Sequence, residues 1–201
     1  MAGIGVVLAL DIATNSGAAF DSPIHGVPIT RLIKLPRSEH DGPKDNKNKT
    51  LSFGPKFSKF RSELVRLIIE VKPALIVYEA PLQILRPGMV DEDGKPKIRT
   101  TMDTIRVLLG LAALAEEVAC SMDVPCEEAR IDKIKRHFTG NSRAKKEDVV
   151  ARCRQLKWDC GGDHNRADAA ALWSMAKSMK DPAWSPISTP LFSALKPKRI
   201  T

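Results

Sequence analysis

The chain has 201 residues, of which 43% are hydrophobic and 28% charged, as expected for an ordinary globular domain. Its apolar runs are far shorter than the roughly 20 residues that a membrane-spanning helix needs, and no charged-then-apolar leader opens the sequence. We therefore expect a cytoplasmic protein without a membrane partner, and the net charge of +8 favours a polyanionic ligand.

The first apolar run, residues 4–10, has no polar alternation and ends on Asp11. Such a run predicts a central strand that is buried on both faces. A carboxylate at the end of a buried strand is partly desolvated, which is unfavourable without a partner. Two interpretations stay open here: Asp11 points toward a cation or a phosphate, or it caps the turn that follows.

Residues 16–20 and 29–35 predict two more strands, joined by connections short enough for an antiparallel meander. The polar residues 36–50 predict a loop. A helix is expected from Pro55, because apolar side chains then recur at intervals of three and four residues as far as Val71.

A second two-sided apolar run, residues 74–79, ends on Glu79. A strand–helix–strand link favours a parallel neighbour with a right-handed crossover. If this strand lies beside the first one, about 4.8 Å away, Asp11 and Glu79 emerge side by side. Like charges that close repel each other unless a divalent cation lies between them, so the recurrence favours a metal site.

The middle of the chain predicts a polar loop at 83–100, a long helix at 101–122, a weak strand at 124–130 and a short helix at 131–138. The apolar face of the long helix is rich in small residues at its centre. That face suits a core helix and also close contact with a second subunit.

A further helix is expected over 144–157, with Lys145 and Lys146 in its first turn. Cations are unfavourable at a helix N-terminus unless an anion binds there as well. The whole segment from Arg130 to Lys157 holds ten Lys or Arg against three Asp or Glu, a balance of +7 that leaves the rest of the chain almost neutral. A basic block of this kind points to nucleic acid.

The last helix is expected to begin near Arg166 and to be buried, because its first turns are rich in alanine. Asp168 lies within that stretch. A charged and unpaired aspartate in such a place costs several kcal/mol. Either a metal ion shared with Asp11 and Glu79 compensates it, or a local hydrogen bond to the loop backbone does.

The remaining features concern the ends and the cysteines. Residues 1–180 predict one domain, and residues 181–201 predict an extended, proline-rich and basic tail. The gaps between the four cysteines fit no zinc pattern, and we interpret them as core or surface thiols. They are Cys120, Cys126, Cys153 and Cys160.

The second half of the chain holds four short motifs: Ile134-Lys135, Phe138-Thr139-Gly140, Ala144 to Val149, and His164 to Ala169. With the two acid-ended strands, they resemble the RuvC-type Holliday-junction resolvases, above all the short phage-like members, in the ribonuclease H-like superfamily. The resemblance covers about residues 4–180. It implies an α/β fold with a five-stranded mixed sheet, three strands antiparallel and two parallel, flanked by helices.

The resemblance also implies a Mg²⁺-dependent endonuclease, with Mn²⁺ as a substitute, that acts as a homodimer on branched DNA such as four-way junctions and forks. A phage-encoded protein of this kind would work in the host cytoplasm. The expected chemistry is two-metal hydrolysis of a phosphodiester. By resemblance, Asp11, Glu79 and Asp168 are catalytic metal ligands and Lys146 is catalytic beside the phosphate.

Two family positions differ in this chain. The fourth metal ligand of the family is Asp or His in many members, and here it is Asn165, preceded by His164, which could take its place. Some members carry an aromatic wedge where this chain has Leu82. The residues expected to bind DNA are Lys133, Lys135, Arg136, Arg143, Lys145 and Lys146.

Two other functions remain open at this stage. A sugar-kinase or actin-like ATPase also begins with an Asp-x-x-Thr hairpin, but it needs a second such domain and a second glycine-rich phosphate hairpin. A non-catalytic module that binds branched DNA is the other alternative, and Asn165 gives it some support.

Overall fold

The structure is a computed structural model that describes residues 5–24, 26–36, 53–81 and 102–181. Apart from Pro36 and Asp181, the expected loop at 36–50 and the tail at 181–201 lie outside these residues, as do Leu82 and the expected loop at 83–100. Within them, no helix combines the length and the apolar character needed to cross a membrane.

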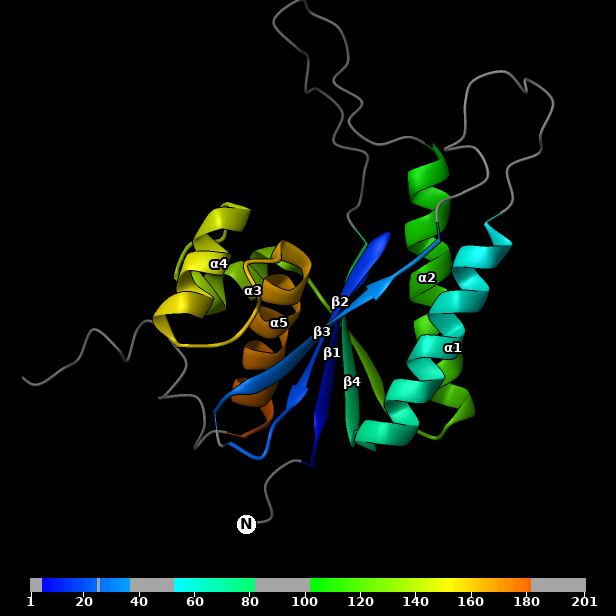
Figure 1. Cartoon of the computed structure of the whole chain (residues 1–201), viewed down its shortest axis with the longest axis horizontal. Helices are drawn as coiled ribbons and strands as arrows, with labels where there is room; N and C mark the ends of the chain where they lie inside the picture. The colour runs from blue at the N-terminus through cyan, green and yellow to red at the C-terminus, as the bar shows by residue number, and fades with distance from the viewer. Residues whose placement is uncertain (1–4, 25, 37–52, 82–101, 182–201) are drawn as a thin grey trace, which may run out of the picture.

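A five-stranded mixed sheet forms the centre of the molecule, in the order β3-β2-β1-β4-β5 (Figure 1). The first three strands form an antiparallel meander, whereas β4 runs parallel to β1 and β5 runs parallel to β4. This confirms the predicted three-plus-two sheet. The strands are β1 (Val7–Asp11), β2 (Asn15–Asp21), β3 (Pro28–Lys34), β4 (Leu75–Glu79) and β5 (Cys126–Ala129).

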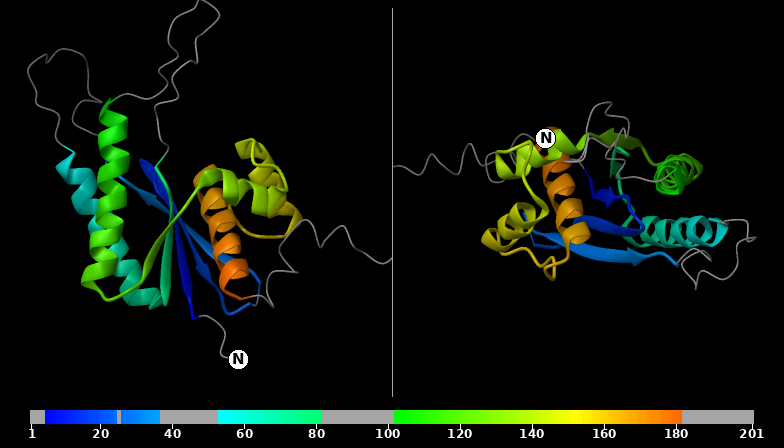
Figure 2. Two further views of the ribbon diagram at one scale, coloured as in Figure 1. Left: turned by 180° about the vertical axis from the view of Figure 1, so that it is seen from behind. Right: turned by 90° about the horizontal axis from the view of Figure 1, so that it is seen from above.

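Helices cover both faces of the sheet (Figure 2). On one side lie α1 (Gly54–Val71) and α2 (Met102–Ser121). On the other lie α3 (Ile131–Thr139), α4 (Lys146–Gln155) and α5 (His164–Lys180). The last helix begins two residues before the expected Arg166, because Asp163 caps it by accepting a 3.0 Å hydrogen bond from the Arg166 N–H.

Each face of the sheet has its own core. Successive residues of β1 point to opposite faces, so Ala9 packs on the α5 side while Leu8 and Leu10 pack on the α1–α2 side. The α5 side is closed by Trp158, whose ring lies 5.5 Å from Phe138 and 5.7 Å from Trp173. All four cysteines are free thiols.

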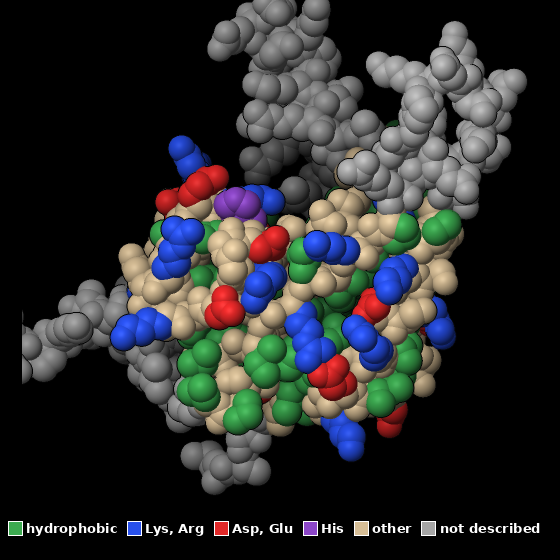
Figure 3. Space-filling model, viewed as in Figure 1, with side chains coloured by type: hydrophobic (Ala, Val, Ile, Leu, Met, Phe, Trp, Pro, Cys, Tyr) green, Lys and Arg blue, Asp and Glu red, His purple; other side chains and the backbone are tan. Residues whose placement is uncertain are grey.

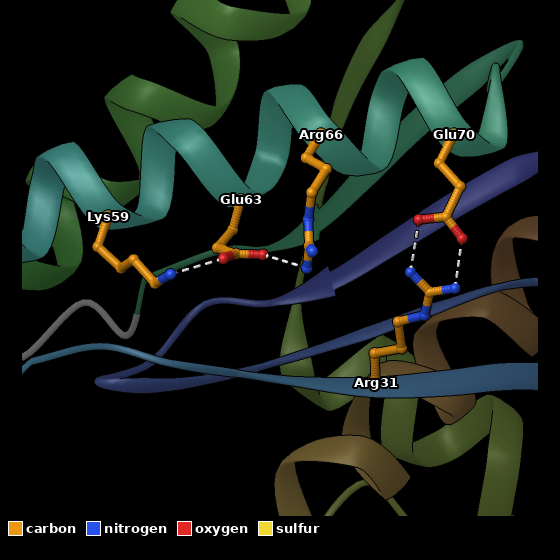
Figure 4. Close-up of polar contacts among 5 residues, drawn as sticks. All are labelled: Arg31, Lys59, Glu63, Arg66 and Glu70. Atoms are coloured by element: carbon orange, nitrogen blue, oxygen red, sulfur yellow. Dashed lines mark hydrogen bonds and ion pairs between the residues drawn. The ribbon is translucent and has the colours of Figure 1, made fainter.

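Polar contacts fasten α1 at its exposed surface (Figure 4). Arg31 on β3 donates two hydrogen bonds to Glu70 near the end of the helix, one of them 2.7 Å long. Glu63 accepts from Lys59 at 2.7 Å and from Arg66 at 2.6 Å. Exposed ion pairs of this kind contribute little, so the apolar face of α1 accounts for most of its attachment.

A half-buried ion pair fastens α5 at the opposite end. Lys177 lies 2.7 Å from Asp21 Oδ1, and the other carboxylate oxygen accepts a 2.7 Å hydrogen bond from the Val7 N–H. The indole N–H of Trp173 donates to the same oxygen at 3.4 Å. The C-terminal half of α5 is thereby tied to the start of β1 and the end of β2.

Candidate active site

Asp11 and Glu79 emerge at the same end of the sheet. In the parallel pairing of β1 with β4, Leu10 lies opposite Tyr78, and the acids are the next residue on each strand. Asp11 is only 8% exposed, and Glu79 is half-buried. The predicted juxtaposition of two acids on adjacent parallel strands is therefore present in the sheet.

The first turns of α5 bring Asp168 to this pair of acids. Burial, then the charges of Glu79 and Asp168, raises the pKa of the Asp11 carboxyl well above its ordinary value. Burial and the charge of Asp168 likewise raise the pKa of Glu79 to about 7. Burial also raises the pKa of Asp168. The three acids thus lie within electrostatic range of one another.

No described residue donates a hydrogen bond to these three carboxylates or forms an ion pair with them. The turn after β1 is instead held by Ser16, whose hydroxyl donates to the Ala13 carbonyl at 2.7 Å and accepts from the Ala13 N–H at 3.2 Å. Neither the turn cap proposed for Asp11 nor the loop hydrogen bond proposed for Asp168 is therefore found within the described ranges.

The chemistry of this donor set fits a divalent cation. Three partly desolvated carboxylates that repel one another supply the hard oxygen ligands that Mg²⁺ and Mn²⁺ prefer. As they stand, however, no three Asp, Glu, His or Cys side chains of the described residues are gathered closely enough to hold a metal ion. The acids interact through their charges but are not close enough together to form a coordination shell.

Two lysines stand beside the acids. The charge of Lys146, at the start of α4, lowers the pKa values of all three carboxyls, and that of Lys135 lowers those of Glu79 and Asp168. Lys135 also donates a 2.7 Å hydrogen bond to the Ala144 carbonyl. That bond links α3 to the segment before α4, at whose start Lys146 lies.

The other basic candidates lie elsewhere on the surface of α3, α4 and the segment between them. Lys133 lines a groove of about 260 Å³ between β5 and the C-terminal half of α5. Arg136, Arg143 and Lys145 are exposed. Figure 3 shows Lys and Arg side chains scattered over one face, with acidic side chains between them, rather than gathered into one patch.

The start of α5 holds the candidates for a fourth ligand. His164 and Asn165 both lie in the first turn, four and three residues before Asp168, which places them on its side of the helix. The charge of His164 lowers the pKa of Asp168. Asp163, which the sequence analysis missed, raises the pKa values of Asp11 and Asp168. The sequence offers one signal for Asp163: it stands directly before an alanine-rich helix, a position typical of a helix cap.

Known structures share the fold of this chain. It superposes on Thermus thermophilus RuvC with a TM-score of 0.57 and 15% identity, over 87% of this chain and 95% of that one. For T. thermophilus RuvC in complex with a Holliday junction substrate, the TM-score is 0.60 at 13% identity, over 92% and 98% of the two chains. The fold is that of the RuvC resolvases.

The yeast mitochondrial Holliday junction resolvase Ydc2 shares this RuvC-like, ribonuclease H-like fold. Its TM-score is 0.57 at 13% identity, over 96% of this chain and 85% of Ydc2. No protein-family model matches the chain, and neither does any curated protein sequence. The RuvC-like fold is thus established by structure, at 13–15% sequence identity.

Proposed function

We propose that this chain is a divalent-metal-dependent endonuclease that cleaves branched DNA in the manner of a Holliday-junction resolvase. The observation that carries the proposal is the placement of Asp11 and Glu79 at the ends of adjacent parallel strands, with Asp168 in electrostatic range of both. Lys135 and Lys146 lie beside these acids, none of which has a described hydrogen-bond partner. The RuvC-like fold supports it, because one such neighbour was solved with a Holliday junction substrate.

In this proposal the three acids bind Mg²⁺, with Mn²⁺ as a substitute. When bound, a pair of such ions supplies Lewis-acid stabilisation of the attacking and leaving oxygens of a phosphodiester. Because the carboxylates repel one another, a divalent cation held by them would offset that repulsion. Asn165 contributes a fourth ligand through its amide oxygen, or His164 replaces it from the same helix turn.

The basic residues hold the DNA. Lys146 offsets the negative charge that builds on the phosphate during attack. The remaining candidates contact the sugar–phosphate backbone and read little base sequence. A homodimer with a two-fold axis would present two such sites to a four-way junction, which is itself nearly two-fold symmetric. These contacts come from Lys133, Lys135, Arg136, Arg143 and Lys145.

A nicking assay tests the proposal on four-way, forked and linear DNA of matched sequence. Wild-type protein with Mg²⁺ should nick the branched substrates, and Asp11→Asn should lose about a thousandfold or more of that rate while still binding the junction. Glu147→Gln, an exposed acid on α4, is the matched control and should cut normally.

The same assay separates the alternatives. Asp11→Asn cutting at the wild-type rate would contradict the metal-site assignment. Junction binding without any cutting by the wild type would favour the non-catalytic module. ATP turnover without nicking would favour the kinase-like alternative.

A further inference from the structure

Gly17 lies in β2 directly opposite Asp11. A Cβ atom built at Gly17 would lie 1.9 Å from the Asn165 carbonyl oxygen, 2.5 Å from its carbonyl carbon and 3.1 Å from the Ala169 Cβ. Gly17 is not among the glycines with positive φ, so its backbone is one that any residue can adopt. Glycine is therefore required at this position because a larger side chain would not fit, and not because of the backbone conformation.

This close approach joins the two elements that carry catalytic acids. Asn165 and Ala169 flank Asp168 along α5, and Gly17 pairs with Asp11 across the antiparallel ladder. The absent side chain lets the first turn of α5 rest directly on the backbone of β2. The spacing between Asp11 and Asp168 therefore depends on the direct contact between the Gly17 backbone and the start of α5.

The far end of α5 cannot easily compensate for a change at this contact. Lys177 and Trp173 hold it to Asp21 at the opposite end of the sheet. A methyl group at Gly17 would have to move the Asn165 carbonyl from 1.9 Å to ordinary contact distance, and that carbonyl is backbone rather than the end of a flexible side chain. The helix would respond by moving its N-terminal turn away from β2.

We propose that Gly17 is a positioning residue that sets the Asp11–Asp168 spacing and, with it, the size of divalent cation that the site accepts. This inference rests on the proposed function. Mg²⁺ demands near-ideal octahedral geometry with ligands at about 2.0–2.1 Å, whereas Ca²⁺ accepts flexible geometry at about 2.3–2.6 Å. Widening the site therefore weakens Mg²⁺ far more than Ca²⁺.

The test is cation binding to the full-length Gly17→Ala protein, measured by Mn²⁺ paramagnetic resonance with Mg²⁺ and Ca²⁺ as competitors. Mg²⁺ affinity should fall by about 10- to 100-fold, the range found when a ligand's supporting contact is removed, while Ca²⁺ affinity changes much less. A merely structural glycine would leave this selectivity unchanged.

Gly5→Ala is the matched control. Its Cβ would lie 2.8 Å from the Ala74 Cβ at the other end of the sheet, so it imposes a milder steric conflict away from the acids. It should lose thermal stability and keep the wild-type cation selectivity. Should Gly17→Ala not fold, Ala169→Ser adds a single atom to the same contact from the helix side and should shift selectivity in the same direction.

The outcomes are distinct. Equal loss of Mg²⁺ and Ca²⁺ affinity, or no loss relative to Gly5→Ala, contradicts the role of Gly17 alone. A wild-type protein that binds no divalent cation contradicts the proposed function itself.

Discussion

At the scale of single residues, Asp11 is the most deeply buried of the three acids. The residue is 8% exposed, and its carboxylate is repelled by the charges of Glu79 and Asp168. No described residue donates a hydrogen bond to that carboxylate. An uncompensated buried charge destabilises the native state unless a ligand offsets it. Functional need and stability therefore oppose each other at this position.

We expect Asp11→Asn to stabilise the metal-free protein by about 1–2 kcal/mol at neutral pH, because it removes this charge. The pKa of Asp11 is raised in the folded state, so the wild type regains native stability as pH falls through that pKa. The difference in unfolding free energy between Asp11→Asn and the wild type should therefore become smaller as pH falls. Urea unfolding in a chelator at several pH values measures it, and a less stable variant at neutral pH would refute this account.

Among the elements, α5 positions the site because it is fixed at both ends. Lys177→Met should cost about 3 kcal/mol, since it leaves the Asp21 carboxylate half-buried without its cation. Lys59→Met removes the same type of side chain from an exposed pair and should cost less than about 1 kcal/mol. Urea unfolding compares the two, and equal losses would show that Asp21 does not anchor the helix.

Much of the arrangement of strands and helices was predictable from sequence. The two apolar runs that end on Asp11 and Glu79 predicted adjacent parallel strands, because an apolar run without polar alternation is typical of a strand buried on both faces. The effect of Asp163 on the pKa of Asp11 was not predictable from sequence. The distance between these two residues is set by how α5 packs on the sheet and not by a local sequence pattern. The close contact at Gly17 arises in the same way from tertiary packing.

At the scale of the whole molecule, the basic residues are more dispersed than the charge run suggested. The run from 130 to 157 is contiguous in sequence, but it forms α3, α4 and their connections, which point in several directions. Lys135 and Lys146 approach the acids, whereas Lys133 lines the groove beside β5. A sequence count of charge cannot resolve these directions.

Salt dependence of junction binding tests which lysines contact DNA. Removing one phosphate contact should lower the slope of log K against log salt by about 0.9. We expect this for Lys146→Ala, and no change for Arg66→Ala, which lies on α1 and pairs with Glu63. Filter binding across a salt series measures both slopes, and equal slopes for Lys146→Ala and the wild type would remove that lysine from the interface.

The most direct test of the central claim is the anomalous scattering of Mn²⁺ in crystals of the wild-type protein. Our account predicts a peak within ligand distance of Asp11, Glu79 and Asp168 that disappears in Asp11→Asn. A peak elsewhere, or none at Mn²⁺ concentrations that support nicking, would contradict it.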